Sequence, residues 1–516
     1  MKKLHIFRYL FLGVLVLALT QSCTDLEEEL FDTVTGDNFF KTDEEFIAAL
    51  GAAYTSLYAI GNHNTYMSSN EVASDEIMIP QRGQDWFDGG VWLRQHRHEY
   101  NEEEGQLNNS WNTLYGGVNN CNRLIAQFEG LANPDTDPFI AELKVLRAYF
   151  YWQLLDMFGN IPVVTSFADA DPNPSTVDRA QVYDFIVGEL TTEVPKLTKA
   201  KDGTTYGRVN YYVGQMLLAK LYLNAGVYSG RTGEWANAAA ACDEIINSGL
   251  YSLEADYFAN FNADNSGSSE NIFAVPYDEV FATGFNLPMM TLHYLSQDTW
   301  NFTAQPWNGY CSLSEFYNSY DDTDLRKGEW GNQKIRGNFI AGPQYAADGV
   351  TQLIDNGAEA NDPDGQGLVF TPELNEHFPN ALRQAGVRVG KFEFYNGGRD
   401  NLNNDFPIFR YSDVLLMKAE ALWHQNAGDA TALALVNQVR ARAGQPDFTE
   451  LTADNLLAER GREMFYENHR RTDLIRFDAY NDAWEFKPAS DPSKNIFPIP
   501  RAQLDANPNL RQNPGY

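Results

Sequence analysis

The sequence has few cysteines and few basic residues for its length. Its 516 residues include no C-x-x-C pair and only four cysteines, Cys23, Cys121, Cys242 and Cys311. This excludes a disulfide framework and the usual zinc and redox motifs. Lysine and arginine number 38 against 70 aspartates and glutamates, which gives a formal net charge of −32. A nucleic-acid-binding protein needs a basic face to neutralise phosphates, so we expect no nucleic acid partner.

Common catalytic motifs are also absent. The sequence contains no H-E-x-x-H, G-x-S-x-G or G-x-x-x-x-G-K-[ST] segment, which are the patterns of zinc proteases, serine hydrolases and phosphate-binding loops. His96 and His98 could share a metal, but such a pair more often meets solvent or a carboxylate. Residues 361–367 resemble part of a calcium loop without its downstream glutamate. We therefore predict no catalytic residue, no metal site and no cofactor, although two carboxylates at glycosidase spacing could still be assembled by folding.

The N-terminus has the form of an export signal. Basic residues precede an apolar run at residues 9–19, which is too short to span a bilayer because about 20 residues are needed. Cys23 follows a small residue directly after this run, which resembles a bacterial lipoprotein processing site. We expect removal of residues 1–22 and lipidation of Cys23; the alternative is a plain signal peptide with an incidental cysteine. The acidic residues 24–29 resemble the export signal of surface lipoproteins in Bacteroidetes, which predicts a location on the outer face of the outer membrane.

Two groups of segments show the three- and four-residue apolar spacing of amphipathic helices. They are residues 138–158, 182–194, 211–226 and 234–247, and then residues 412–426, 429–443 and 452–468. Residues 219–226 and 421–428 look alike, and their small side chains let antiparallel helices pack closely, as in tetratricopeptide-type hairpins. An unrelated helical bundle could show the same alanines.

The segment between the two helical groups lacks such periodicity. We expect residues 252–410 to form an irregular lobe of short strands, loops and a few short helices, because a structureless loop of that length is implausible. A shorter irregular segment is expected at residues 62–106. The predicted fold is mainly α, divided into an N-terminal region at 23–251, the lobe at 252–410 and C-terminal hairpins at 411–516.

Four motifs together resemble the SusD/RagB family of surface glycan-binding lipoproteins. The matching segments are residues 147–162, 407–421, 459–476 and 499–516. The resemblance implies four tetratricopeptide-like hairpins that support an irregular ligand-binding lobe, with a SusC-like TonB-dependent transporter as the partner. The motifs themselves indicate scaffold, because Glu459, Glu463 and Glu467 recur every four residues among arginines and favour ion pairs.

Aromatic residues make up 13% of the chain, and this surplus suggests a ring-lined surface. Five tryptophans fall in helical or near-helical segments and are expected in the core: Trp111, Trp152, Trp235, Trp423 and Trp484. Five fall in irregular polar segments: Trp86, Trp92, Trp300, Trp307 and Trp330. Sugars offer apolar faces and hydroxyls, so a glycan site needs flat rings and planar polar groups.

Two loops combine such residues, at 81–92 and at 299–311. The resemblance implies that ligand contacts come from these two regions, so we predict that both loops line one shallow groove. The candidate ligand-binding residues are Trp86 first, followed by Arg82, Asp85, Trp92, Trp300, Trp307 and Asn308. For each of them, packing within the lobe is the alternative role.

The sequence thus predicts a lipid-anchored, non-enzymatic receptor that captures an oligosaccharide at the cell surface and passes it to the transporter. Two alternatives remain open: a peptide-capturing receptor of the RagB type, and a surface glycoside hydrolase. The identity, linkage and length of the glycan do not follow from the sequence.

Overall fold

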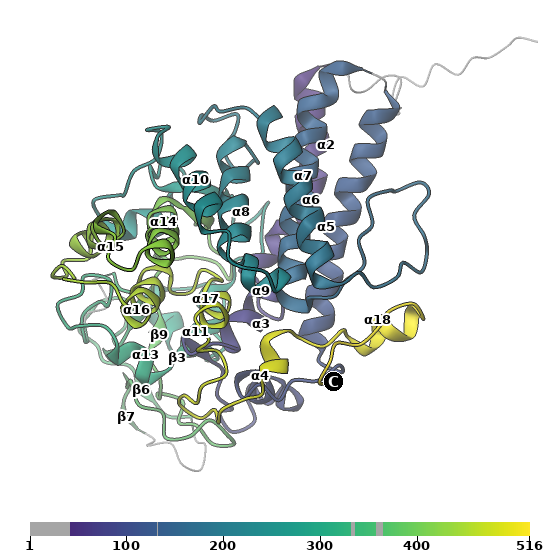
Figure 1. Ribbon diagram of the computed structural model, residues 1–516. Helices are drawn as coiled ribbons and strands as arrows, with labels where there is room; N and C mark the ends of the chain where they lie inside the picture. The colour runs from purple at the N-terminus through teal and green to yellow at the C-terminus, as the bar shows by residue number, and fades with distance from the viewer. Residues whose placement is uncertain (1–41, 132, 332–335, 358–364) are drawn as a thin grey trace, which may run out of the picture. The chain divides into compact units, whose positions relative to one another are not determined.

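The computed structural model describes residues 42–131, 133–331, 336–357 and 365–516 (Figure 1). The expected signal peptide, the lipidated Cys23, the acidic segment after it and most of the calcium-like loop lie outside these residues. Ala49–Tyr516 form one compact unit, and the division of the chain into three regions stays a prediction. None of the helices in the described ranges is long and apolar enough to cross a membrane.

Helices provide most of the regular structure, so the expected mainly α fold is confirmed. In the first half of the chain they are α2 (Asp43–Tyr54), α3 (Tyr66–Val72), α4 (Val91–His96), α5 (Gly105–Gly130), α6 (Asp137–Phe158), α7 (Arg179–Glu193), α8 (Tyr211–Leu223), α9 (Ala225–Ser229) and α10 (Trp235–Ile246). Near the C-terminus they are α14 (Tyr411–Gln425), α15 (Ala430–Arg442), α16 (Ala453–Met464), α17 (Arg470–Arg476) and α18 (Arg501–Ala506).

The long helices pack in sequence as a hairpin array. Helix α5 lies against α6, α6 against α7, α8 against α10, and α14 against α15 and α16 (Figure 1). The two groups are joined where α10 and α8 contact α14. At this junction Lys220 Nζ lies 2.5 Å from Asp413 Oδ2 with both side chains buried, so an ion pair links helices that are distant in sequence.

Helix α5 has bounds that were not predicted from the sequence, although Trp111 within it was expected in a helical or near-helical segment. Its glycines and asparagines lower the intrinsic helix propensity, and tertiary packing compensates for them. A Cβ at Gly117 would lie 2.5 Å from the ring of Phe150. Gly117 therefore allows α6 to approach α5 closely. The segment 62–106, expected to be irregular, also contains α3 and α4.

The single helix expected at 452–468 is interrupted. Helix α16 ends at Met464, and both Tyr466 (φ 55°) and Asn468 (φ 64°) adopt left-handed backbone conformations, which end a helix. The turn carries Glu467 into the interior, where Lys391 Nζ lies 2.5 Å from Glu467 Oε1. The helix therefore ends before Glu467, and the turn that follows brings this residue into a buried ion pair.

The segment between α10 and α14 is irregular, as expected. Its described strands are short, and its two ends are joined by antiparallel pairing of β2 (Asn271–Val275) with β10 (Phe406–Arg410). The other strand pairs are β1 (Ile77–Met78) with β3 (Cys311–Ser312), β4 (Phe339–Ile340) with β9 (Arg388–Val389), β5 (Gly342–Pro343) with β8 (Val369–Phe370), and β6 (Ile354–Asp355) with β7 (Gln366–Gly367). Three short helices accompany them: α11 (Leu287–Thr291), α12 (Ser296–Trp300) and α13 (Ser314–Asn318).

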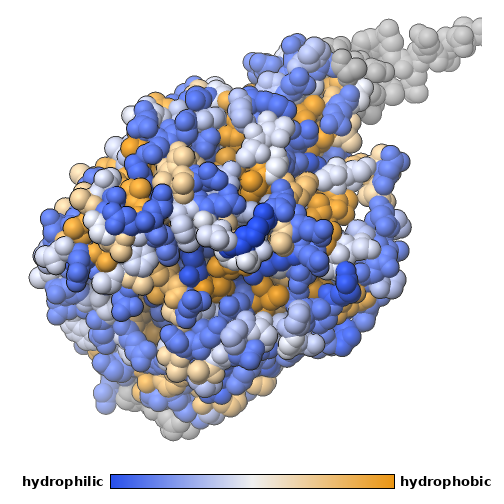
Figure 2. Space-filling view, in the orientation of Figure 1, coloured by the Kyte–Doolittle hydropathy of each residue, from blue (hydrophilic) through white to orange (hydrophobic). Residues whose placement is uncertain are grey.

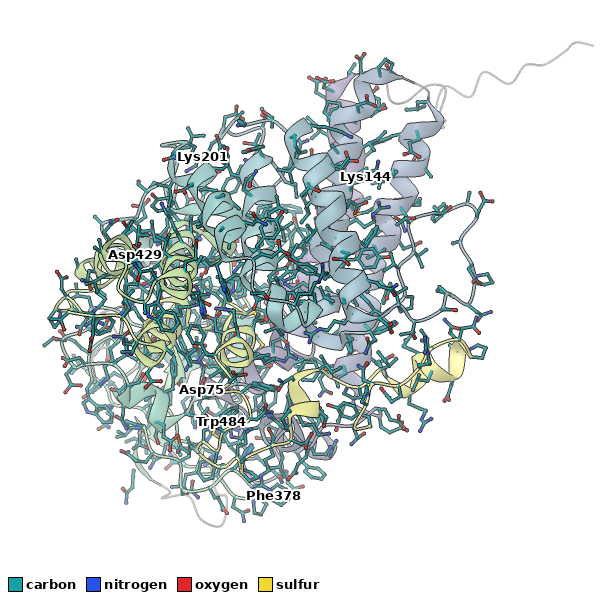
Figure 3. The ribbon with its side chains drawn as sticks, viewed as in Figure 1. Asp75, Lys144, Lys201, Phe378, Asp429 and Trp484 are labelled. Atoms are coloured by element: carbon teal, nitrogen blue, oxygen red, sulfur yellow. The ribbon has the colours of Figure 1, made fainter. Side chains whose placement is uncertain are left out.

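The repeated glutamates of α16 form a buried ion-pair network, which confirms their structural role. Arg326 Nη1 lies 2.8 Å from Glu459 Oε1 and 3.1 Å from Glu463 Oε2, with all three side chains 0% exposed. Asp75, labelled in Figure 3, forms an ion pair with Arg470, with Nε 2.7 Å from the carboxylate. This pair links the segment after α3 to α17. These pairs connect the irregular segment to the helical array.

The tryptophans expected in the core divide into two sets. Trp111 and Trp152 are buried, whereas Trp235, Trp423 and Trp484 are only partly buried. Trp235 stacks on the ring of His424 at a centroid distance of 3.9 Å. Trp235 and Trp423 lie in α10 and α14 on surfaces that stay partly exposed. Trp484 lies in an isolated β-bridge with Lys487 and in no helix, so its expected helical setting is wrong.

Candidate ligand-binding pocket

Two loops that are more than 200 residues apart in sequence meet at one pocket. Loop A is residues 81–92 and loop B is residues 299–311. Their connection is direct, because Trp86 Nε1 donates a hydrogen bond to the Trp307 carbonyl oxygen at 2.7 Å. The pocket has a volume of about 430 Å³ and is lined by His63, Asp85, Trp86, Asp88, Tyr294, Gln305, Pro306 and Trp307.

Aromatic rings form one side of the pocket. The Trp86 and Trp307 ring centroids are 6.5 Å apart and the ring planes are inclined at 46°. The His63 ring contacts both indoles edge-on, at centroid distances of 6.0 Å from Trp86 and 5.4 Å from Trp307. Trp307 is 36% exposed and Trp86 is half-buried, so both rings offer surface to a ligand.

The position of Trp86 depends on its neighbours. Its backbone adopts a left-handed conformation (φ 59°), which is uncommon for a bulky residue and marks a locally constrained turn. The indole lies on Gly309, and the ring of Tyr310 meets it edge-on at 5.9 Å. Loop B therefore supplies the surface on which the loop A tryptophan rests.

Arg82 and Asn308 lie beneath the pocket. Both are essentially buried, at 1% and 0% exposed. Arg82 Nε donates to the Asn308 carbonyl oxygen at 3.0 Å and Arg82 Nη2 to the Ala385 carbonyl oxygen at 2.8 Å. The Asn308 side chain donates to the Arg383 carbonyl oxygen and accepts from Arg388 Nη2 at 2.8 Å. We expected both as ligand contacts, but their polar atoms hold the loops together, so they are positioning residues.

Trp92 and Trp300 also lie away from the pocket lining. Trp92 is 2% exposed, and its Nε1 donates to Asp88 Oδ2 at 2.9 Å. Trp300 stacks on Phe302 at a centroid distance of 5.8 Å and packs beside Met289 and Leu292. The expectation that Trp92 stacks on a ligand is corrected, because its ring is buried beside Asp88. Trp300 is partly exposed and packs on a neighbouring apolar cluster outside the pocket lining, so its role as a ligand contact stays a prediction.

A third segment supports loop A from the other side. Gln81 N donates to the His377 carbonyl oxygen and Ala381 N to the Gln81 carbonyl oxygen, each at 3.0 Å. This places residues 377–381 against the start of loop A. Phe378, labelled at the lower edge of Figure 3, marks this part of the molecule.

The polar groups of the pocket include two carboxylates. Asp85 accepts a hydrogen bond from the Tyr294 hydroxyl, and burial together with Asp85 raises the pKa of Tyr294, so this hydroxyl stays protonated. Burial lowers the pKa of His63, with a smaller opposing effect from Asp88, so its ring is neutral at pH 7. Uncharged rings, hydroxyl, carboxamide and carboxylate acceptors together suit stacking and hydrogen bonding with a polyhydroxylated ligand.

Of the predicted residues, Asp85, Trp86 and Trp307 line the pocket. Five further lining residues were not predicted: His63, Asp88, Tyr294, Gln305 and Pro306. Asp88, Gln305 and Pro306 lie inside the two predicted loops, so their position in the sequence could have indicated them as lining residues. His63 and Tyr294 lie outside both loops, and only the folded chain brings them to the pocket.

Among the described residues, no group of three or more His, Cys, Asp or Glu side chains is arranged to hold a metal ion. The two histidines considered for a metal have other contacts: His96 Nε2 lies 2.8 Å from the Glu485 carbonyl oxygen and His98 Nδ1 lies 2.9 Å from the Ser490 hydroxyl. Both rings are buried, and burial lowers the pKa of each.

The chain is similar to known proteins in sequence and in fold. A model described as the SusD family matches residues 269–516, and one described as starch-binding and associating with the outer membrane matches residues 62–216. The starch-binding protein SusD of Bacteroides thetaiotaomicron is 26% identical, with 77% of this chain and 76% of that protein covered. The SusD-like protein P2 of Formosa agariphila is 25% identical, with 98% of each covered.

Solved structures share the fold. The surface glycan-binding protein A from Bacteroides thetaiotaomicron, in complex with laminarihexaose, matches with a TM-score of 0.72 and 24% identity over 91% of this chain and 99% of that one. A SusD superfamily protein from Parabacteroides distasonis matches with a TM-score of 0.74 and 21% identity over 94% of this chain and 100% of that one. The class is therefore the tetratricopeptide-like helical array with an irregular lobe. Within that class, the chain belongs to the SusD family.

Proposed function

We propose that this protein captures oligosaccharides at the outer surface of the outer membrane and passes them to a SusC-like TonB-dependent transporter. The observation that carries the proposal is the pairing of Trp86 and Trp307 in one open pocket beside polar acceptors. The starch-binding relative and the laminarihexaose complex of a structural neighbour support a glycan as the ligand.

The pocket suits weak, reversible binding. Stacking on an aromatic ring contributes on the order of 0.5–1.5 kcal/mol beyond area burial, and the pocket offers two indoles. Affinity differences between related complexes lie mainly in the dissociation rate. A receptor that hands its ligand to a transporter benefits from fast dissociation.

Binding rather than hydrolysis is the activity we infer. A glycosidase acid is a carboxyl group shielded from water so that it stays protonated. Asp85 and Asp88 are exposed. Asp85 accepts a hydrogen bond from the Tyr294 hydroxyl, and Asp88 accepts one from the Trp92 indole. These carboxylates therefore suit hydrogen bonding with sugar hydroxyls.

Membrane attachment is assigned to Cys23, which lies outside the described residues. We expect Cys23→Ala to release the protein from the membrane, because two or more acyl chains on one residue are enough to anchor a soluble domain. Fractionation of cells that express each form measures this. The control is Cys121→Ala, a buried cysteine that should stay with the membrane, and equal membrane retention of the two variants would contradict the anchor.

Trp86→Ala tests the binding site directly. We expect affinity for the bound glycan to fall about tenfold or more, equivalent to about 1.4 kcal/mol, because a stacking ring is lost from the pocket. Isothermal titration against a glycan panel measures this. The matched control is Trp330→Ala, since Trp330 is 52% exposed but does not line the pocket.

The same titrations separate the alternatives. Unchanged binding by folded Trp86→Ala would remove this pocket from the proposal. Binding of peptides with no binding of glycans would favour a RagB-type receptor. Shortened oligosaccharides in the reaction mixture would identify a hydrolase.

A further inference from the structure

The charged side chains that line the pocket are all acidic. Asp85 and Asp88 contribute carboxylates, and the eight lining residues among those described include no lysine or arginine. Aspartate side chains carry negative charge at neutral pH. Both residues are exposed at the pocket, so a ligand that enters it meets their charge directly.

The arginines nearest in sequence do not offer a cation to a ligand. Arg82, the basic residue of loop A, is 1% exposed, and its guanidinium donates to backbone carbonyl oxygens beneath the pocket. Arg94 of α4 follows loop A; its Nη2 donates to Glu104 Oε2 at 2.8 Å and its Nη1 to the Gly89 carbonyl oxygen at 2.8 Å. Loop B contains no basic residue.

The rest of the molecule adds to the same field. The net charge of −32 repels anions at long range, although salt screens this effect beyond about 8–10 Å. The face shown in Figure 2 is covered mainly by hydrophilic residues. The exposed carboxylates of the pocket have the same sign as the net charge of the chain. Two cations beneath the pocket, Arg82 and Arg388, are 1% and 0% exposed and bond Asn308, so an anionic polymer meets the carboxylates first.

We propose that the pocket selects uncharged glycans and rejects those carrying carboxylate or sulfate groups, with Asp85 and Asp88 as the specificity-determining residues. This inference rests on the proposed function. A sugar hydroxyl donates a hydrogen bond to a carboxylate, whereas an anionic substituent is an acceptor that is repelled by it. The aromatic rings attract any glycan, whereas the two carboxylates repel anionic ones, and this difference gives the specificity.

A matched set of ligands tests the proposal. The set comprises a neutral glycan that binds in the panel, its C6-carboxylated derivative, and the methyl ester of that derivative, which restores neutrality on the same backbone. Isothermal titration at low salt should give an affinity for the carboxylated form at least about tenfold below that of the ester. In about 1 M NaCl, where the screening length is about 3 Å, this ratio should shrink.

The double variant Asp85→Asn, Asp88→Asn assigns the effect to residues. Asparagine keeps a carbonyl oxygen that can accept from Tyr294 and Trp92, so the pocket geometry is retained while its charge is removed. We expect the ratio between ester and carboxylated form to fall about fivefold or more, since like-charge repulsion is lost. The control is Asp322→Asn, an exposed aspartate outside the pocket, which should leave the ratio unchanged.

The outcomes distinguish this inference from the proposed function. Equal binding of ester and carboxylated form by the wild type, or an unchanged ratio in the double variant, overturns the inference. If only anionic glycans of the panel bind, and Trp86→Ala abolishes that binding, the proposed function stands and the charge selection is wrong. If no glycan binds, the proposed function itself fails.

Discussion

Gly309 illustrates how single residues determine the pocket. A Cβ at this position would lie 2.4 Å from two atoms of the Trp86 indole and 3.0 Å from the Met290 carbonyl oxygen. The indole and the backbone of loop B therefore share a space that only glycine leaves open. Trp86 keeps its place because a residue 223 positions later in the sequence has no side chain.

Gly309→Ala should therefore weaken ligand binding without removing any ligand contact. The indole must move to admit the methyl group, so we expect affinity to fall about tenfold and stability to fall by about 1–3 kcal/mol through overpacking. Titration and urea denaturation measure the two effects.

Gly116→Ala is the control for this substitution. Gly116 lies in α5, where an added Cβ would meet no described atom within 4 Å. It should raise stability by about 0.5–1 kcal/mol and leave binding intact. Normal binding by Gly309→Ala would show that Trp86 does not need its present position.

Helix α16 shows what one element contributes to the assembly. Its glutamates face arginines from the irregular segment, from β10 and from α15. Burial alone would raise the pKa of Glu463, but Arg442, Arg410 and Arg326 lower it well below its usual range. Three parts of the chain are thus held against α16 by charges that water does not reach.

Glu463→Gln tests this network. Removing one partner from a buried ion pair leaves an uncompensated charge, so we expect the free energy of unfolding to fall by about 3–5 kcal/mol. Asp184→Asn is the matched control, because its pair with Arg231 is 58% and 53% exposed and such pairs contribute about 0–1 kcal/mol. Urea denaturation compares them, and similar losses in both variants would disprove a special role for burial.

Stability of the whole molecule depends on pH through buried acids. Burial raises the pKa of Glu71 to about 8, although the Asn468 amide, which donates to Glu71 Oε1 at 2.7 Å, opposes the shift. The folded state therefore holds a proton that the unfolded chain releases near pH 4.5. The contribution of this group to stability is complete below pH 4.5 and is lost as pH rises toward 8.

Glu71→Gln should flatten this pH dependence. Between about pH 5.5 and 7.5 one proton corresponds to about 1.4 kcal/mol per pH unit, and the variant should lose up to that slope. Urea denaturation at several pH values gives the free energies, with Glu450→Gln at an exposed site as the control. A slope identical to that of the wild type would mean that Glu71 is ionised in the folded protein.

The sequence determined the helices of the array, because apolar spacing along residues such as those of α6 and α14 is a local property. It also indicated which loops carry exposed tryptophans. The bounds of helix α5 were not predicted, because its glycines have low helix propensity. The need for glycine at position 117 follows only from the neighbouring ring of Phe150.

Only the tertiary structure shows which polar and aromatic residues line the pocket and which are buried beneath it. Arg82, Trp92 and Asn308 have the same chemistry as binding residues, but packing directs their polar atoms inward. His63 and Tyr294 line the pocket although they lie outside both loops. Such choices depend on contacts between distant parts of the chain, and local sequence patterns carry no information about which distant segments meet.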